Sequence, residues 1–365
     1  MNLRPLAIYI HFPYCKSRCP YCDFFRNILP KDFDESAWVR KCREDIAYFY
    51  DICGERIVKS VFFGGGTPSL LSADSMQIVL DELSRKFCIR EDAEISLEAN
   101  PNTFERDKFI DFSKVGVNRL SLGVQALSDD GLKFLGRTHS VYDALKAMEL
   151  GREVFPKFSV DLMYARPNQN WDNWKAEVDK ALSFGIKHIS LYQLAIEEGT
   201  IFYKKNIKPL DDERSASLYE QTINYLRERG LDRYEVSNFA VSSEHESIHN
   251  LVYWQGGDYI GIGEGAHGRF IDDGVIKASV DGRVTEILSS EQRAEELVIM
   301  GLRIRDGINR KAFFEACGLN LFDFLSKNKT KKLAELNLLC YDDDNIKLTD
   351  KGFLVLDQII LELLS

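Results

Sequence analysis

The feature that most constrains this 365-residue chain is a regular alternation of short apolar runs with longer helical patterns. The apolar runs predict buried strands, and the 3.6-residue spacing of apolar residues between them predicts helices. Strands that alternate with helices through short connections favour parallel pairing, in a barrel or a doubly wound sheet. The chain is therefore expected to fold as an α/β domain. The six predicted strands are residues 6–10, 58–63, 94–97, 118–123, 157–160 and 188–192.

Polar or backbone-exposing residues stand at the carboxyl end of every predicted strand. In parallel α/β barrels the active site is built from those ends, so we expect these groups to meet at one site. Glu98 or Gln125 alone could merely cap the following helix, but all six are hard to explain as caps. In chain order the groups are a cysteine-rich loop, Gly64–Gly66, Glu98, Gln125, Asp161 and Gln193.

The loop after the first strand reads CKSRCPYC and carries three thiols, on Cys15, Cys19 and Cys22. Thiolates favour zinc or iron–sulfur clusters, and a cubane cluster normally takes four of them. The next cysteines, Cys42 and Cys53, fall inside a predicted helix. One iron of a cluster would therefore keep an open position, as reactive metal sites do. A three-thiol zinc site, or cysteines without a metal, are the alternatives.

Charge and composition narrow the functional class. The net charge of −10 argues against broad nucleic-acid binding, which needs a basic surface. A basic run at 327–332 could contact phosphates, but its acidic surroundings favour a solvated helix start. The other cysteines are scattered, which indicates a reducing compartment. Met1–Phe12 lacks the apolar segment of a signal peptide, and no run reaches membrane-spanning length. A cytoplasmic protein is expected.

Beyond Ala195 the alternation loosens. We predict that residues 1–240 form the first domain, and that 241–288 form a glycine-rich connecting region containing the sequence HNLVYW. Residues 289–365 form a C-terminal domain. It opens with a helix that extends to about residue 304, and residues 310–364 follow the pattern helix, helix, a small hairpin at 340–348 and a closing helix, which is the outline of a winged-helix module.

The cysteine spacing, with Tyr21 just before the last cysteine, is typical of the radical S-adenosylmethionine (SAM) superfamily. The chain resembles, nearly end to end, the branch that contains oxygen-independent coproporphyrinogen III dehydrogenase and the HemW heme chaperones. This resemblance implies a partial (β/α)6 barrel of the TIM type, a smaller, mainly helical C-terminal domain and a [4Fe-4S] cluster on the three cysteines. The matching stretches are YIHFPYCKSRCPYCDF, FGGGTPSLL, ISLEANP, NRLSLGVQ, LGRTHS, VDLMYARP, HNLVYW and GIGEGAHG.

The resemblance also implies which residues contact SAM. Glycines allow bare backbone to approach the ligand, carboxylates suit its ribose and sulfonium, and Arg137 suits its carboxylate. Taken singly, Tyr9 and Ala195 could instead be core residues. No residue is assigned a catalytic role. The implied positions are Tyr9, Tyr21, Gly65, Gly66, Thr67, Glu98, Gln125, Arg137, Asp161 and Ala195.

Three departures from the dehydrogenase favour the chaperone. Phe24 stands where the dehydrogenase has a further cysteine, only 14 residues precede Cys15, and residues 249–254 match the HNxxYW motif of the chaperones. The implied function is to bind heme and deliver it to acceptor proteins, for which the resemblance suggests membrane respiratory enzymes, with an electron donor serving the cluster. Coproporphyrinogen III dehydrogenase is the less expected alternative, and SAM cleavage is left open.

His249 is the predicted heme ligand, because neutral imidazole is a common ligand of heme iron. A hydrogen-bonded structural role is its alternative. The ligand could instead be His245, His267 or Cys317. The chain departs from the chaperone pattern at Ala165-Arg166, where Gly-Leu is usual, and at Gly268, where Ser is usual. Both departures are expected near the SAM pocket.

Overall fold

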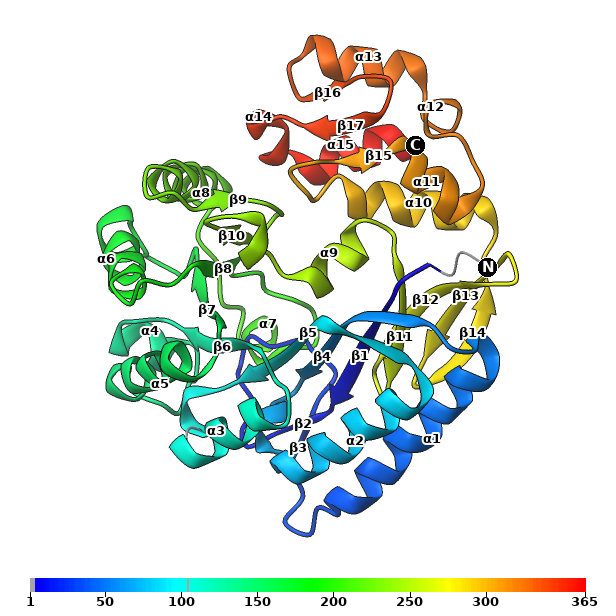
Figure 1. Ribbon diagram of the computed structural model, residues 1–365. Helices are drawn as coiled ribbons and strands as arrows, with labels where there is room; N and C mark the ends of the chain where they lie inside the picture. Colours follow the sequence, from blue (N-terminus) through cyan, green and yellow to red (C-terminus); the bar gives the residue numbers. More distant parts are fainter. Residues whose placement is uncertain (1–3, 104) are drawn as a thin grey trace.

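The computed structural model describes residues 4–103 and 105–365. Within those ranges the dominant feature is a twelve-stranded sheet in the order β14-β13-β12-β11-β1-β4-β5-β6-β7-β8-β10-β9. The order runs from one free edge to the other, so the sheet is an open, partial barrel (Figure 1). The predicted partial (β/α)6 barrel is confirmed. Its parallel centre comprises β1 (Leu6–Phe12), β4 (Ile57–Gly65), β5 (Cys88–Ala99), β6 (Arg119–Gln125), β7 (Lys157–Tyr164) and β8 (His188–Gln193).

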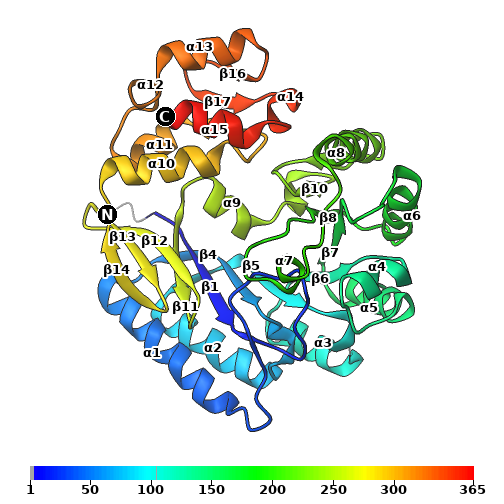
Figure 2. The same cartoon turned by 180° about the vertical axis from the view of Figure 1, so that it is seen from behind.

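Helices between these strands cover the outer face of the sheet (Figures 1 and 2). Several begin where polar side chains cap them: Asp34 accepts from Ala37 N–H, and Ser72 accepts from Ser75 N–H. The helix predicted to start at residue 104, which lies outside the described residues, is described from Arg106. The covering helices are α1 (Glu35–Cys53), α2 (Ala73–Lys86), α3 (Arg106–Lys114), α4 (Asp129–Phe134), α5 (Val141–Val154), α6 (Trp171–Leu182) and α8 (Asp212–Arg227).

Successive side chains of β1 alternate between the hydrophobic core and the interior of the barrel. Ile8, Ile10 and Phe12 belong to the main hydrophobic core with residues of α1 and α2. Tyr9 and His11 alternate with them and therefore face the concave side. Functional groups on the inner face are thus supported by a continuous apolar layer behind them.

The glycine-rich segment predicted as a connecting region joins the main sheet. β11 (Asp258–Ile262) pairs in parallel with β1, and β12 (His267–Asp272), β13 (Val275–Val280) and β14 (Arg283–Ile287) continue as an antiparallel meander. A Cβ on Gly261 would lie 2.4 Å from the carbonyl oxygen of His267. Glycine there permits two strands to approach closely, so the sequence that suggested only turns also forms strands.

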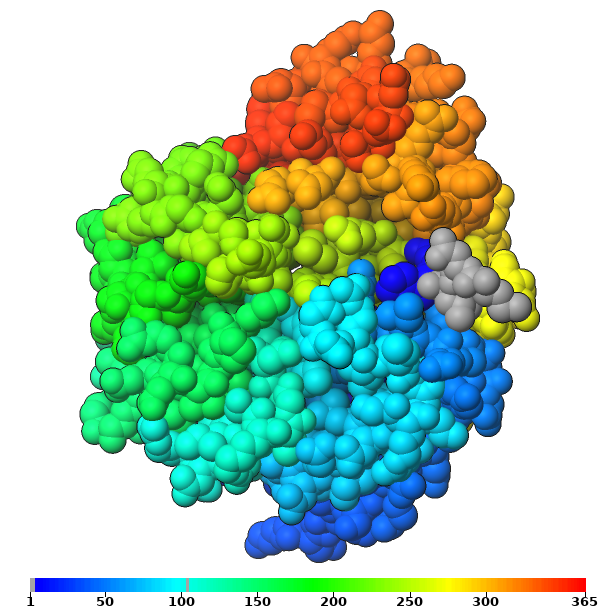
Figure 3. Space-filling view, in the orientation of Figure 1, coloured from blue at the N-terminus to red at the C-terminus, as the bar shows by residue number. Residues whose placement is uncertain are grey.

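The opposite edge carries β10 (Asn238–Ala240) and β9 (Asp232–Arg233). The C-terminal domain has its own apolar core and lies at one end of the molecule, next to α9 (Ile248–Trp254) (Figures 1 and 3). The order of helices, a hairpin and closing helices agrees with the winged-helix prediction, but from Arg310 onward three helices rather than two precede the hairpin, and two rather than one follow it. Its elements are α10 (Ser290–Gly301), β15 (Ile308–Asn309), α11 (Arg310–Cys317), α12 (Leu321–Phe324), α13 (Lys327–Glu335), β16 (Leu339–Tyr341), β17 (Asn345–Leu348), α14 (Asp350–Phe353) and α15 (Leu356–Leu364). None of the helices in the described ranges is both long and apolar enough to cross a membrane.

Candidate functional site

A cavity of about 350 Å³ lies at the carboxyl ends of the six parallel strands. Every strand-end group that the sequence singled out contributes to its wall, from the cysteine loop to Gln193. The structure therefore brings together residues that are far apart in the chain, such as Cys15 and Gln193, which are separated by 178 positions. The predicted residues that line it are Cys15, Cys19, Tyr21, Cys22, Gly65, Gly66, Thr67, Glu98, Gln125, Arg137, Asp161 and Ala195.

The cysteine loop is held by backbone pairing and by one arginine. The short strands β2 (Tyr14–Cys15) and β3 (Asn27–Ile28) close its base. Arg26 lies between them in sequence and donates to the carbonyl oxygens of Cys19 at 3.2 Å and Cys22 at 2.8 Å. The loop is therefore anchored at both its base and its tip, and the three thiols remain beside the cavity.

Two side chains donate hydrogen bonds to the sulfurs. Thr67 Oγ1 lies 3.4 Å from Cys15 Sγ, and Arg137 Nη1 lies 3.4 Å from Cys19 Sγ. Such donors support and tune thiolate ligands. No three His, Cys, Asp or Glu side chains of the described residues converge on a position for a single metal ion. A cubane cluster does not need such convergence, because each cysteine binds a different iron.

Gly65 and Gly66 are required by packing as well as by access to the cavity. Gly65 has φ +106°, and a Cβ there would lie 2.5 Å from the His11 ring. A Cβ on Gly66 would lie 2.5 Å from the carbonyl oxygen of Tyr14. The absence of side chains thus lets the end of β4 pack directly beneath the cysteine loop.

Two carboxylates share the cavity wall. Glu98 accepts a hydrogen bond from the Gly65 N–H at 3.0 Å, and both Asp161 oxygens accept from Ser121 Oγ at 3.0 and 2.9 Å. Loss of hydration, reinforced by the nearby charge of Asp161, raises the pKa of Glu98 to about 8. Loss of hydration also raises the pKa of Asp161. Because two carboxylates repel each other in one cavity, the arrangement suits a positively charged ligand.

Arg137 brings an unsatisfied donor to the same cavity. Its Nη2 donates to the Gly123 carbonyl oxygen at 2.8 Å and to the Asn100 side chain. Its Nε is buried and has no hydrogen-bond partner among the described residues. A buried N–H left unpaired is costly, and a carboxylate ligand would satisfy it. The donor set therefore fits the amino-acid end of SAM.

Gln125 reaches the cavity through a distorted strand end. Its φ is +70°, which is unusual for a residue other than glycine. The pairing of β6 with β7 shifts register between Gly123 and Gln125, and such irregularities redirect side chains. Strained backbone of this kind gathers at functional sites. Ser121, Gly123 and Gln125 all line the cavity.

Tyr9 and His249 do not line this cavity. The Tyr9 hydroxyl is hydrogen-bonded to His11 Nδ1 at 3.0 Å. His249 is 1% exposed, stacks on Phe62 and has both ring nitrogens engaged, with Ser60 Oγ at 3.0 Å and the Tyr253 hydroxyl at 2.5 Å. Burial lowers the pKa of His249 to about 3. The structure thus shows His249 in the structural arrangement that was its alternative, and heme ligation by it stays a prediction that requires α9 to move.

The alternative heme ligands are placed differently. His245 is half-buried, and its Nδ1 is bonded to Ser242 Oγ at 3.0 Å. Cys317 is buried, and its thiol donates to the Phe313 carbonyl oxygen. His267 is exposed at the start of β12.

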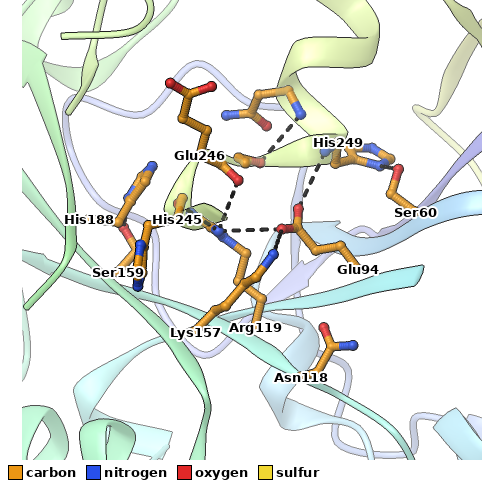
Figure 4. A network of polar contacts seen from close by, with 12 residues as sticks. Ser60, Glu94, Asn118, Arg119, Lys157, Ser159, His188, His245, Glu246 and His249 are labelled. Atoms are coloured by element: carbon orange, nitrogen blue, oxygen red, sulfur yellow. Dashed lines mark hydrogen bonds and ion pairs between the residues drawn. The ribbon is translucent and has the colours of Figure 1, made fainter. Parts of the chain in front are cut away.

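A second polar cluster closes the amino ends of the strands (Figure 4). The fully buried carboxylate of Glu94 pairs with Arg119 and Lys157, each at 3.3 Å, and accepts the His249 N–H at 3.3 Å. Arg119 also donates to the His245 carbonyl oxygen at 3.0 Å. This network fastens the segment before α9 to the floor of the barrel, and the sequence analysis did not predict it.

The sequence analysis also missed several cavity residues. Ser121 was detectable, because it precedes Gln125 by an even number of positions on one strand and so shares its face. Arg26 gave no comparable signal. The cavity-lining residues that were not predicted include Asn100, Ser121, Met163 and Tyr192.

The two departures from the chaperone pattern, which were expected near the SAM pocket, do not themselves line the cavity. Ala165 is buried with φ +60°, a conformation in which glycine would be unstrained. Arg166 pairs with Glu177 beside a separate cavity. A Cβ on Gly268 would lie 2.3 Å from Ser279 Oγ on the neighbouring strand. Both sites therefore concern packing rather than the cavity wall.

Comparisons with known proteins agree with this architecture. Residues 9–181 match the radical SAM superfamily, and residues 288–355 match the HemN C-terminal domain. The chain is 38% identical to "Radical S-adenosyl methionine domain-containing protein 1, mitochondrial" from Bos taurus, over 98% of this chain and 87% of that protein. It is 39% identical to the heme chaperone HemW of Escherichia coli, over 76% of this chain and 74% of that one, and 33% identical to HemW of Bacillus subtilis, over 97% of each.

Among solved structures, the coproporphyrinogen III oxidase HemN of Escherichia coli superposes with a TM-score of 0.81. The match covers 100% of this chain and 91% of HemN at 20% identity, which establishes the common fold. The fold and the cysteine-lined cavity are those of a radical SAM protein, and membership of that superfamily implies a [4Fe-4S] cluster and SAM as cofactors. Within the superfamily, the chain belongs to the coproporphyrinogen III oxidase-like branch that includes HemW.

Proposed function

We propose that this protein is a heme chaperone that holds a [4Fe-4S] cluster and SAM in the strand-end cavity, binds heme and delivers it to acceptor proteins. The cavity supports the proposed binding of a cluster and SAM, because three cysteines, two carboxylates and an arginine with an unpaired nitrogen line the same space. The heme part is supported by relatives 30 to 39% identical that are named heme chaperones.

Different residues would bind the cluster and SAM. Cys15, Cys19 and Cys22 would hold the cluster and leave one iron open to SAM, while Arg137 would pair with the SAM carboxylate. Glu98 and Asp161 would stabilise the cationic sulfonium and the ribose hydroxyls. When bound, the cluster and SAM supply one-electron chemistry. The protein's own contribution is to orient both groups and to exclude water from between them.

Coproporphyrinogen III dehydrogenase remains the second candidate, since HemN shares the fold. The position of Phe24 favours the chaperone. It lines the mouth of the cavity with an exposed phenyl ring, where the dehydrogenase has a cysteine. The acceptor, which we expect among membrane respiratory enzymes, the electron donor and the cytoplasmic location are further parts of this proposal.

Anaerobic reconstitution tests the cofactors first. We expect about four irons and four sulfides per chain, and Cys15→Ala should abolish this content. Cys88→Ala is the matched control, since Cys88 is exposed and outside the cavity, and it should retain the cluster. Zinc without acid-labile sulfide in the wild-type protein would contradict the proposal.

The same reconstituted sample separates the two functions. The chaperone should bind added hemin stoichiometrically and should form no protoporphyrinogen from coproporphyrinogen III with SAM and a reductant. Protoporphyrinogen in that assay would establish the dehydrogenase instead. Failure of the wild-type protein to bind hemin would refute the chaperone.

A further inference from the structure

An exposed apolar surface begins directly after the third cluster cysteine. The side chains of Phe24, Phe25 and Ile28 are 64%, 48% and 55% exposed. Phe24 lines the mouth of the strand-end cavity. Arg26, from within this stretch, is bonded to the carbonyl oxygens of Cys19, Cys22 and Phe24. The loop is thus fixed with its aromatic side chains directed outward, which is costly for a surface without a ligand.

This aromatic segment packs against the turn that leads to His267. A Cβ on Gly265 would lie 2.4 Å from the Phe25 ring, so the ring rests on the bare backbone of the β11–β12 turn. His11 also holds this segment in place, because its Nε2 is hydrogen-bonded to the Phe25 carbonyl oxygen at 3.0 Å. His267 opens β12 two residues after Gly265.

The imidazole of His267 is available to a ligand. In β12, Gly268 and Phe270 are buried, so His267 points to the opposite face, and it is exposed. Among residues 4–103 and 105–365, its ring has no hydrogen-bond partner. His249, by contrast, is buried with both nitrogens engaged. Of the histidines considered as heme ligands, His267 combines an open ring with an adjacent apolar surface.

Exposed positive charges lie on the loop next to this apolar surface. Lys16 and Arg18 are exposed on the cysteine loop, and Lys16 lines the cavity mouth. Asp23 and Glu197 also line it, so the mouth is mixed in charge while its exposed cations lie on the loop that precedes the aromatic residues. A ligand with a flat apolar body, a metal that accepts imidazole and peripheral carboxylates matches this combination.

We propose that heme docks at the cavity mouth on Phe24, Phe25 and Ile28, with His267 as its axial ligand and its propionates toward Lys16 and Arg18. This inference rests on the proposed chaperone function and assigns its heme site. It places heme beside the cluster loop rather than on the HNxxYW helix. A change at the cluster can then act directly on the surface that holds heme.

Hemin titration of the anaerobically reconstituted protein, followed by Soret difference absorption, tests the site. His267→Ala should weaken hemin binding about tenfold or more and remove the histidine-ligated signal in electron paramagnetic resonance. Added imidazole should restore that signal. The double variant Phe24→Ser with Phe25→Ser should weaken binding while the iron and sulfide content stays unchanged.

His245→Ala is the control, because His245 is a half-buried histidine that lies at the amino ends of the strands, away from the cavity mouth. It should bind hemin as the wild-type protein does. Wild-type affinity and spectrum in His267→Ala would overturn this site and leave the chaperone function standing. A wild-type protein that binds no hemin would overturn the proposed function and this site together.

Discussion

Buried carboxylates lie at both ends of the parallel strands, but the charges around them differ. At the amino ends, Glu94 is surrounded by Arg119, Lys157 and the His249 N–H, all supplied by the chain itself. At the carboxyl ends, Glu98 faces a second carboxylate across a cavity, and Arg137 Nε has no partner among the described residues. A buried carboxylate with counter-ions from the chain stabilises the fold, whereas two carboxylates in one cavity suit a cationic ligand. Each end also has one buried arginine nitrogen without a partner among the described residues, Arg119 Nη2 and Arg137 Nε, so the carboxylates alone distinguish the ends.

Removal of Glu94 should have the largest effect on stability. Glu94→Ala leaves the Arg119 guanidinium, which is 4% exposed, without its buried counter-ion. Breaking such a pair costs about 3–5 kcal/mol, so the free energy of unfolding should fall by that amount in urea denaturation. Asp111→Ala is the control, because it removes an exposed pair with Lys114 and should cost under about 1 kcal/mol. An equal loss of unfolding free energy in the two variants would mean that the buried Glu94 pair contributes no more to stability than an exposed pair.

Glu98 should affect ligand binding rather than folding. Its pKa of about 8 lies above the usual value, so the group is mostly protonated at neutral pH. A cationic ligand favours the ionised form, and the affinity for SAM should therefore rise as pH increases through about 8. Glu98→Gln should weaken SAM binding about tenfold and flatten this dependence.

Isothermal titration calorimetry at several pH values measures both effects. Asp161→Asn is an internal check, because removing the neighbouring charge lowers the pKa of Glu98 and should move the transition to lower pH. An unchanged pH profile in Glu98→Gln would mean that the carboxylate does not sense the ligand.

Substitution of Lys157 should have the smallest effect, and that effect is on stability. The Lys157 side chain is 29% exposed, and Arg119 still pairs with Glu94 when it is removed. Lys157→Met should therefore lower the free energy of unfolding by about 1 kcal/mol, measured by the urea midpoint. A loss as large as that of Glu94→Ala would show that the network acts as one unit and not as two pairs.

Much of the fold could be predicted because its information is local. Apolar runs identified the six parallel strands, and the residues that end them identified the cavity. β11 to β14 were missed because their glycines suggested turns, while the partner that makes β11 a strand is β1, at the other end of the chain. A local sequence pattern does not show which distant strands will pair.

The heme ligand shows the same limit for the site. The HNxxYW motif predicts chemistry for His249, but its ring is satisfied by Ser60, 189 positions away on β4. Arg26 was missed for a related reason: it acts through backbone carbonyl oxygens, which leave no trace in the sequence of the cysteine loop.

Gly66 has a consequence for how this protein can vary. Its α-carbon supports the backbone of Tyr14, one residue before the first cysteine, with no room for a methyl group. An alanine there would lift the loop by roughly the thickness of that methyl and shift all three sulfurs relative to Glu98 and Asp161. The distance between the cysteine loop and the two carboxylates thus depends on the missing side chain of Gly66, the residue directly after β4.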